Sequence, residues 1–511
     1  MYRLHPLLEI LTGFSLLLTS TAIVYYKWKY TYWKKKNLPY LQPTIPFGNL
    51  QSLVTTTDSL GMVLKRLYEE LKRKNHPHGG VYFFARHIYM VVNVENIDRM
   101  LSKDFHHFVD RGLYYNEKDD PISAHLFCIG GKKWRNLRVQ LSETFTSGKI
   151  KAMFDVFTHC EKNLQEIFEI LHQKKQPIDI KDVLSCFTTD VIGRCAFGMN
   201  CDTLKDKDYP LRTYVKKFFT YSIGRLLVAL FTMNFPNAAR NLNIKAVPKD
   251  ISNFFDKLFR NIVHDRETNN YVKDDYIQIL INMKNSKLAR DEGYNHDGKT
   301  VTIEELTAQS FLLFVAGVEN ASIAPTWALY ELAKNQEIQQ KVRNEINIVM
   351  DKHDGKITYD TIQEMTYMNQ VLYETLRKYP PIPFLNRQCV KDYKIPEHSV
   401  IIERGTRVVI PVLGIHYDEE YYPDPDKFDP ERFDEKKLTA RHRCCFIPFG
   451  FGPRMCLGLR FAMMQAKVVL TSLLKNYNFT LNEKTKEPLK FSKNSVSVQA
   501  EGGIWLDVKK Y

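Results

Sequence analysis

Ten residues near the C-terminus, FGFGPRMCLG at 449–458, decide the fold. Their glycines and proline predict a tight turn, and the apolar 3–4 spacing over 457–476 predicts that a helix follows directly. Backbone N–H groups at the start of a helix favour the charged form of a nearby thiol. A glycine-containing turn also lets the backbone approach a flat cofactor closely. We therefore predict that Cys456 presents a thiolate to a flat cofactor that carries a metal.

The same stretch resembles the cysteine-ligand loop of the cytochrome P-450 superfamily. All five fixed positions of that family's signature, Phe-x-x-Gly-x-Arg-x-Cys-x-Gly, are present. The resemblance implies a haem b cofactor (iron-protoporphyrin IX) whose iron takes Cys456 as its axial ligand, because a thiolate donates electron density that promotes O–O cleavage. It also implies that Phe449 shields the sulfur from water and that Arg454 pairs with a haem propionate.

Two further elements match haem-binding positions of the family. Trp134 and Arg138 are four residues apart on a predicted helix and resemble the Trp-x-x-x-Arg element that binds a propionate. Arg387 lies where another propionate-binding arginine is usual. On residue type alone, Trp134 and Arg387 would more often be a packing residue and a surface residue.

A Glu-x-x-Arg pair, Glu374 and Arg377, lies on one face of another predicted helix. Most such pairs are solvated surface charges. The sequence Pro-Glu-Arg-Phe follows at 430–433. Together these residues resemble the family's Glu–Arg–Arg network, which implies that Arg432 joins Glu374 and Arg377 to brace the haem pocket.

The long helix predicted at 302–333 departs from the family's pattern at one position. Ala316, Gly317 and Glu319 match the motif Ala/Gly-Gly-x-Asp/Glu-Thr, but Asn320 replaces the threonine. The resemblance implies that the small residues open a groove for dioxygen and that the acid and the alcohol relay protons. An amide can hydrogen-bond and hold water, but it cannot pass on a proton as an alcohol can.

Pro325 in the same helix predicts a kink. The replacement of threonine by Asn320 leaves three functions of the protein open. The favoured function is a monooxygenase that inserts one atom of dioxygen into an apolar small molecule, such as a xenobiotic, a plant toxin or an endogenous lipid or hormone. The second is an isomerase or lyase that converts hydroperoxides without a reductase, since family members of that kind can carry asparagine here. The third is a non-catalytic haem protein that binds apolar ligands.

Periodic patterns over the rest of the chain predict a mainly α protein with small β-sheets, an α+β fold. Short β-rich runs at 81–86 and 88–93 predict a hairpin, and strands are expected at 496–500 and 504–508. The resemblance implies the cytochrome P-450 fold, with haem between the oxygen-activating helix and the cysteine loop. We find no internal repeat, so residues 51–511 are interpreted as one catalytic domain. Helices are predicted at 94–103, 131–145, 151–174, 180–197, 251–270, 302–333, 337–352, 361–378 and 457–476.

The N-terminus predicts a membrane anchor over residues 1–26. No residue from 10 to 26 is charged, a length at the lower limit for spanning the bilayer core. Tyr25 and Trp28 predict an aromatic belt, and the lysines that follow place the catalytic domain on the cytosolic side, which with the resemblance implies the endoplasmic reticulum membrane. A cleaved signal peptide is the alternative, but the early region carries little positive charge. Prolines in the basic segment 27–50 predict a stiff, extended linker.

The formal net charge of +14 is compatible with nucleic acid, an anionic membrane or an acidic protein partner. The basic residues are scattered and show no zinc-finger or RNA-binding pattern, so nucleic acid is not expected. Nine cysteines without a Cys-x-x-Cys pair favour a reducing compartment. No flavin or nicotinamide domain is evident. The resemblance therefore implies that NADPH is used indirectly, through the membrane-bound NADPH–cytochrome P-450 reductase, with cytochrome b5 as an optional donor.

Several segments, 32–35, 190–198, 328–334 and 428–433, are most similar to insect microsomal members linked to foreign-compound metabolism. Aromatic and aliphatic richness predicts an apolar small-molecule substrate. The apolar segment 218–231 is interpreted either as helical core or as a shallow membrane contact. Substrate contacts are expected, by resemblance, in segments 110–127, 218–231, 311–323, 381–385 and 498–504.

Overall fold

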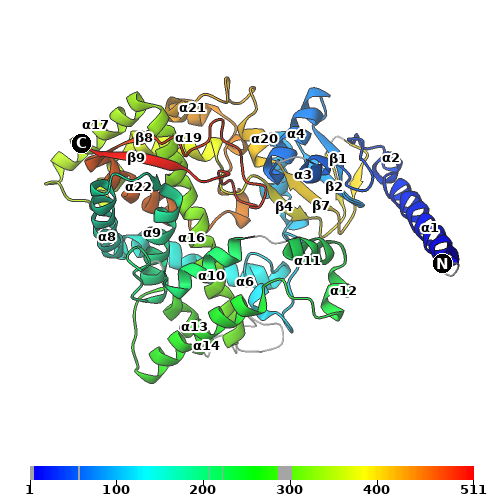
Figure 1. The fold of residues 1–511 in the computed structure, drawn as a ribbon, viewed down its shortest axis with the longest axis horizontal. Coiled ribbons are helices and arrows are strands. Elements are labelled where there is room, and N and C mark those ends of the chain that lie inside the picture. The colour runs from blue at the N-terminus through cyan, green and yellow to red at the C-terminus, as the bar shows by residue number, and fades with distance from the viewer. Residues whose placement is uncertain (1–4, 56–57, 207, 221–222, 286–301, 397) are drawn as a thin grey trace.

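The computed structural model describes residues 5–511 except 56–57, 207, 221–222, 286–301 and 397. Helices make up most of this chain, and the two larger of its three small sheets lie on opposite sides of the helical body (Figure 1). The predicted α+β fold is confirmed. The helices are α1 (His5–Lys29), α2 (Tyr32–Lys35), α3 (Gln51–Thr55), α4 (Leu60–Arg73), α5 (Val94–Asp98), α6 (Gly131–Ser142), α7 (Ser147–Ala152), α8 (Phe154–Gln173), α9 (Ile180–Phe197), α10 (Pro210–Phe219), α11 (Ile223–Asn234), α12 (Pro236–Asn241), α13 (Lys249–Thr268), α14 (Tyr276–Asn285), α16 (Ile303–Lys334), α17 (Gln336–Lys352), α18 (Tyr359–Glu364), α19 (Thr366–Lys378), α20 (Val412–His416), α21 (Glu435–Ala440) and α22 (Leu459–Asn476). The strands are β1 (His78–Phe83), β2 (Arg86–Val91), β3 (Ile178–Asp179), β4 (Leu385–Gln388), β5 (Tyr393–Lys394), β6 (Ile401–Ile402), β7 (Arg407–Ile410), β8 (Tyr477–Leu481) and β9 (Trp505–Lys510).

The predicted helices are confirmed with shifted boundaries, apart from those expected over 94–103 and 361–378. Over 94–103, the α-helix α5 ends at Asp98 and a π-helix continues over Arg99–Lys103. The segment 361–378 is divided as well. That segment belongs to two helices, α18 and α19. The carboxylate of Glu345 on α17 accepts hydrogen bonds from the backbone N–H groups of Tyr367 (2.6 Å) and Met368 (2.8 Å) at the start of α19. This cap comes from another helix, so local periodicity does not reveal the break.

The β1–β2 hairpin is confirmed, although its turn comes earlier than predicted. The turn contains Phe84, whose φ of 54° lies in the left-handed region, and His87 belongs to β2. The hairpin forms part of a four-stranded sheet in the order β1-β2-β7-β4, in which β7 runs parallel to β2. A second sheet has the order β3-β9-β8, and its β9 confirms the strand predicted at 504–508. The third sheet pairs β5 with β6.

The strand predicted at 496–500 is wrong. The backbone of Val498 bonds two other elements instead of a neighbouring strand: its carbonyl accepts from Trp327 Nε1 (3.0 Å) and its N–H donates to the carbonyl of Pro381 (3.1 Å). Tertiary contacts thus satisfy the backbone groups that a ladder would otherwise pair.

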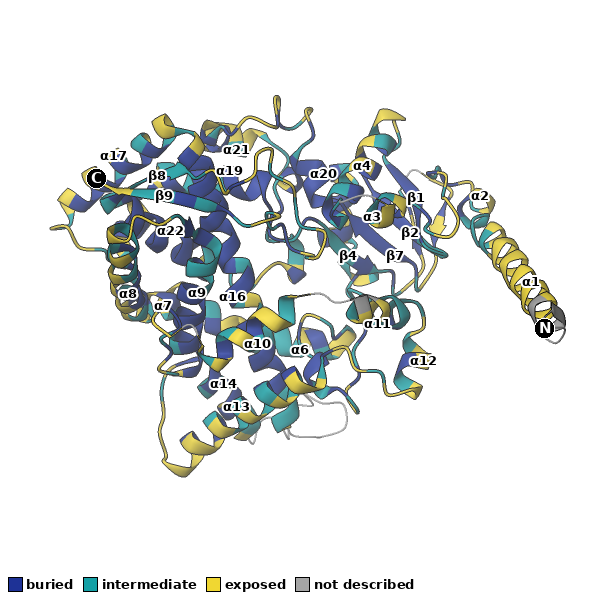
Figure 2. Cartoon of the chain, viewed as in Figure 1, coloured by how far each residue is buried: buried dark blue, intermediate teal, exposed yellow. Residues whose placement is uncertain are grey.

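The helix α16 forms the core of the body. A capping box of Thr302 and Glu305 begins it, and it packs against α9, α19 and α22. Most of its C-terminal half is buried (Figure 2). The helix continues through Pro325 without a break, so the kink predicted there stays a prediction.

The basic linker 27–50 packs against the body and is not a free spacer. The Trp33 side chain is 1% exposed, and its Nε1 donates to the carbonyl of Val81 on β1 (3.4 Å). Gly80 provides the space, because a Cβ at that position would lie 2.3 Å from the Trp33 ring. The N–H of Leu41 donates to the carbonyl of Gly80 (3.0 Å). The helix α1 therefore leaves the body from a fixed base.

The helix α1 projects from the body (Figures 1 and 2). Within the described chain, two helical segments are long and apolar enough to cross a membrane, Glu9–Lys35 and Ile303–Lys334. The second is α16, whose apolar stretch is 67% buried, so it is a core helix. The first is entirely unburied, which is consistent with the predicted membrane anchor.

Replacing Trp33 by Ala should lower the free energy of unfolding by about 3–5 kcal/mol, because it leaves a large cavity against β1. Urea unfolding of the full-length protein in detergent measures this loss. Trp28, which is 58% exposed on α1, provides the matched control, and Trp28→Ala should leave the midpoint unchanged. Equal losses in the two variants would contradict the packed linker.

Candidate functional site

A cavity of about 320 Å³ lies between α16, α6, β4 and the turn that precedes α22. Its walls are mainly aliphatic and aromatic, and the residues known to line it include no carboxylate. Glu319 is not among them. The sequence-predicted site residues that line the cavity are Ala316, Gly317 and Asn320 from α16, Trp134 and Arg138 from α6, Arg387 from β4, and Phe449, Arg454 and Cys456 from the turn.

The turn before α22 depends on two glycines. Gly450 and Gly452 have φ values of 76° and 73°, a region that side chains rarely adopt. A Cβ on Gly452 would also lie 1.8 Å from the carbonyl oxygen of Leu101, so no larger residue fits. The N–H of Cys456 donates to the carbonyl of Phe449 (2.9 Å), which closes the turn. The predicted turn followed by a helix is present as expected.

Cys456 lies deep in the protein, yet water-sized molecules can reach its sulfur because it faces the cavity. Burial raises the pKa of the Cys456 thiol, whereas the N–H of Gly458 and the charge of Arg138 act to lower it. No group of three or more His, Cys, Asp or Glu side chains in the described chain could hold a bare metal ion. A metal bound at Cys456 must therefore bring its other ligands with it, as the metal of a macrocycle does.

Four arginines line the cavity, and the charges of three of them, Arg111, Arg387 and Arg454, act on one another. Arg387 and Arg454 are buried, and their Nε atoms lack hydrogen-bond partners among the described residues. Burial and the charges of neighbouring arginines lower the pKa of Arg454 to about 9 and that of Arg111 to about 10, and hold that of Arg387 far below its ordinary value. Asp110 approaches Arg454 only to 4.0 Å. A ligand with more than one carboxylate fits this cluster.

The other contacts of these arginines hold them in place. Arg454 Nη2 donates to the carbonyl of Ile129 (2.8 Å), and its guanidinium lies 4.2 Å from the centre of the Trp134 ring. Arg111 Nη2 donates to the carbonyl of Arg454 (3.4 Å), and its guanidinium stacks on Phe127. Arg111 was included in the expected contact segment 110–127, but no local signal singled it out as a member of the cluster.

The side chains of the predicted motif on α16 point in two different directions. Ala316 and Asn320 are about one turn apart and face the cavity together. Asn320 Nδ2 donates to the carbonyl of Ala316 (3.3 Å). Glu319 is 4% exposed and lies outside the cavity, where its carboxylate pairs with Lys181 of α9 (2.8 Å) and accepts a hydrogen bond from Gln499. Adjacent helical residues differ by about 100° in direction, which separates the two side chains.

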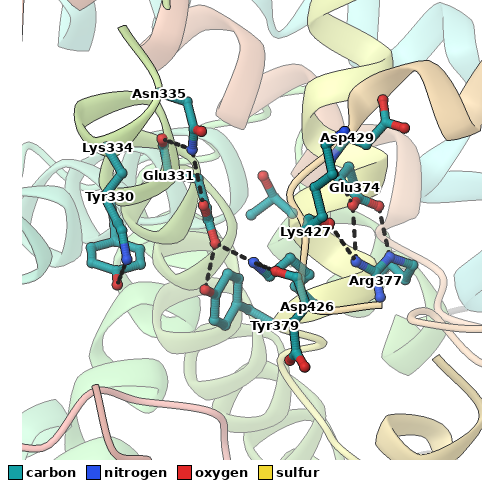
Figure 3. A network of polar contacts seen from close by, with 12 residues as sticks. Tyr330, Glu331, Lys334, Asn335, Glu374, Arg377, Tyr379, Asp426, Lys427 and Asp429 are labelled. Carbon is teal, nitrogen blue, oxygen red and sulfur yellow. Dashed lines mark hydrogen bonds and ion pairs between the residues drawn. The ribbon is translucent and has the colours of Figure 1, made fainter. Parts of the chain in front are cut away.

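The Glu374–Arg377 pair is fully buried (Figure 3). Two hydrogen bonds of 2.7 and 2.9 Å join the side chains, and Arg377 also donates to the carbonyls of His416 (2.8 Å) and Pro425 (2.7 Å). Burial opposes the charge on Arg377, but the contact with Glu374 outweighs it and raises the pKa of Arg377. Arg432 lies 3.5 Å from the Glu374 carboxylate, so the three predicted members of the network are together.

His416 extends this network to the cysteine turn. Its Nδ1 lies 3.1 Å from the carbonyl of Arg377, and its Nε2 lies 3.1 Å from the N–H of Ile447. Burial and the charge of Arg377 lower the pKa of His416 to about 3. The neutral ring can therefore donate to the Arg377 carbonyl and accept from Ile447, two residues before the turn. The sequence analysis missed His416, because a lone histidine carries no local signal.

A flat macrocycle with a central metal and two carboxylates fits these observations. Cys456 offers a single ligand, the arginine cluster offers the positive charge, and the apolar walls suit the ring. This combination of a mainly helical body, a thiol and an arginine cluster defines a haem–thiolate protein.

Comparisons with known proteins agree with that class. A sequence model described as Cytochrome P450 matches residues 38–506. The chain is 39% identical over 505 residues to "Probable cytochrome P450 6a23" of Drosophila melanogaster, which covers 98% of this chain and 99% of that protein. It is 37% identical over 503 residues to "Cytochrome P450 6a2" of the same organism, which covers 97% and 99%. The chain belongs to the cytochrome P450 family.

Family membership confirms the resemblance stated from the sequence, including the similarity to insect members. The protein is a cytochrome P450 monooxygenase, and its family implies a haem cofactor. The roles of the individual site residues stay predictions.

Replacing Arg377 by Met should cost about 3–5 kcal/mol in the free energy of unfolding, because it leaves the Glu374 carboxylate buried without its partner. The midpoint of thermal or urea unfolding measures the loss. Lys341→Met is the control, since the Lys341–Glu431 pair is exposed at 58% and 59% and should contribute under about 1 kcal/mol. Similar losses in the two variants would show that burial of the pair is unimportant.

Proposed function

We propose that this monooxygenase oxidises apolar small molecules, either foreign compounds or endogenous lipids, with electrons that NADPH supplies through a membrane-bound reductase. Cytochrome b5 is an optional second donor. The observation that carries the proposal is the apolar cavity, which is lined by Cys456 together with Ala316 and Asn320 of α16. Its aliphatic and aromatic walls suit an apolar substrate.

In this proposal, the Cys456 thiolate ligates haem iron and Phe449 keeps water from the sulfur. Trp134, Arg138 and the cluster of Arg111, Arg387 and Arg454 bind the propionates. The positive charge of the cluster supports this role. Haem bound in this way supplies the redox chemistry that activates dioxygen, so that one oxygen atom enters the substrate and the other leaves as water.

Asn320 is proposed to hold a water molecule that delivers protons. Its Nδ2 donates to the carbonyl of Ala316 and the residue lines the cavity, so its Oδ1 is available to accept a hydrogen bond from water. Glu319 is held outside the cavity by Lys181 and Gln499. In this proposal, a proton that passes through Glu319 comes from outside the cavity, and a water held by Asn320 carries it onward.

A second candidate is a reductase-independent rearrangement of hydroperoxides, and Asn320 is the observation that favours it. An amide holds substrate oxygen or water without transferring a proton, which is sufficient for a reaction that does not consume dioxygen. A third candidate, haem-dependent sequestration of apolar ligands without turnover, shares the same cavity.

The chain expressed in microsomes should convert members of an apolar substrate panel only when NADPH, reductase and dioxygen are all present. Direct turnover of fatty-acid hydroperoxides without these components, with the panel untouched, would establish the rearranging enzyme instead. Binding spectra without any product would favour sequestration.

Two cysteine variants accompany this experiment. Cys456→Ser should abolish the thiolate-type carbon monoxide spectrum and all NADPH-dependent product. Cys128→Ser should keep both, because Cys128 is not among the residues that line the cavity. A thiolate-type spectrum that survives in Cys456→Ser would defeat the ligand assignment.

We also propose that residues 1–26 anchor the chain in the endoplasmic reticulum membrane, with residues 51–511 as a catalytic domain facing the cytosol. The unburied apolar helix α1 supports the anchor. The helix α11, with exposed Leu227, supports a second, shallow contact, and exposed Phe235 and Leu242 flank it and α12. Residues 221–222 of the apolar segment lie outside the described chain.

Deleting residues 1–26 should make the chain extractable from microsomes by alkaline carbonate while leaving part of it bound at physiological salt. The additional changes Leu227→Asp and Phe235→Asp should release that remainder. Ile348→Asp, at an exposed apolar residue of α17, is the matched control and should release none. Extraction of the intact chain by carbonate would contradict the anchor.

A further inference from the structure

The irregular hairpin at 490–501 is tied to α16 at two points. Trp327 Nε1 donates to the carbonyl of Val498 (3.0 Å), and Gln499 Nε2 donates to the carboxylate of Glu319. The two α16 residues are eight positions apart, so the helix holds adjacent hairpin residues over more than two turns. Val498 is buried although its segment forms no strand.

The hairpin is also tied to the loop at 381–382. The N–H of Val498 donates to the carbonyl of Pro381 (3.1 Å). Pro381 and Ile382 line the cavity, as do Ala316 and Asn320 of α16. One residue of the hairpin thus accepts a hydrogen bond from α16 and donates one to this loop.

The Trp327 donor is held rigidly. Its indole is 1% exposed and stacks on the Tyr379 ring, with centroids 3.9 Å apart and planes 5° from parallel. Tyr379 is fixed in turn, because its hydroxyl donates to Glu331 (2.6 Å; Figure 3). Glu331 also pairs with Lys378 (2.8 Å). Tyr379 lies two residues before Pro381. The contacts of Trp327 and Glu331 with Tyr379 therefore connect α16 to the loop at Pro381 a second time.

We propose that Trp327 is a positioning residue. The bridge from Trp327 through Val498 to Pro381 fixes the separation of the two cavity walls and thereby the orientation of the substrate. Trp327 acts through the hairpin and touches no substrate. Gln499 supports the same bridge from the Glu319 side. The inference rests on the proposed oxidation of apolar substrates in this cavity.

Three variants of the full-length holoenzyme test the bridge. Trp327→Phe removes the donor and keeps an aromatic ring beside Tyr379, and Gln499→Ala removes the second tie at a partly buried site. Tyr330→Phe is the matched control, because it removes a hydrogen bond of 2.5 Å from α16 to Glu487, which lies in the same connection between β8 and β9 but before the hairpin. Gln499→Ala decides the question if Trp327→Phe does not fold.

Hydrogen exchange of the peptide 490–501 should be about fivefold faster in Trp327→Phe and Gln499→Ala than in the wild type and Tyr330→Phe, as expected for the loss of one net hydrogen bond. The dissociation constant of 4-phenylimidazole should rise about threefold in the same two variants. That of imidazole, which is too small to reach both walls, should stay the same. Both titrations are followed by the haem spectrum and need no turnover.

Product distribution gives the functional readout. Dodecanoic acid offers many similar carbons, and the ratio of its hydroxylated products should change at least twofold in Trp327→Phe and Gln499→Ala. If hydrogen exchange of the peptide 490–501 is unchanged in both variants, the bridge does not exist. If exchange is faster but the dissociation constant of 4-phenylimidazole is unchanged, the bridge does not control the cavity. If the wild type forms no product from any member of the apolar substrate panel, the proposed function fails, while exchange and titration still decide the bridge.

Discussion

Complete burial of the Glu374–Arg377 pair is the constraint on which the rest of the structure depends. A guanidinium without water must find every hydrogen-bond acceptor within the protein. Arg377 finds them in the carbonyl of His416 at the end of α20 and in that of Pro425 in the irregular segment that follows. Burial, together with the charge of Arg377, favours the neutral form of His416, which accepts a hydrogen bond from Ile447. The place of the cysteine turn therefore follows from an ion pair on α19, although that turn has little regular structure of its own.

The arginines beside the cavity differ from Arg377, because they lie next to one another rather than against a carboxylate. Burial and mutual repulsion depress their pKa values, so ionising all three costs free energy in the protein alone. An anionic cofactor removes that cost. Cofactor binding is consequently coupled to the stability of the loops that carry these side chains, by the same linkage that joins any native-state ligand to folding.

Much of this could be predicted from the sequence, for identifiable reasons. The cysteine turn is encoded locally, since glycines, proline and helix start are contiguous, and most helices follow from apolar spacing. Side-chain direction was harder: Asn320 and Glu319 are neighbours in one motif, yet only Asn320 lines the cavity. Arg111, His416 and the hairpin at 490–501 depend on partners distant in the chain, and the break before α19 depends on Glu345 of α17. Local patterns contain no information about such partners.

The packed linker has a consequence for how the enzyme meets other molecules. With Trp33 seated against Gly80, the body cannot swivel about the end of α1. Two proteins anchored in one bilayer search for each other in two dimensions rather than three. Under the anchoring proposed here, a linker packed against the body would fix the height and tilt at which the enzyme meets a membrane-bound partner, so that each encounter presents the same surface.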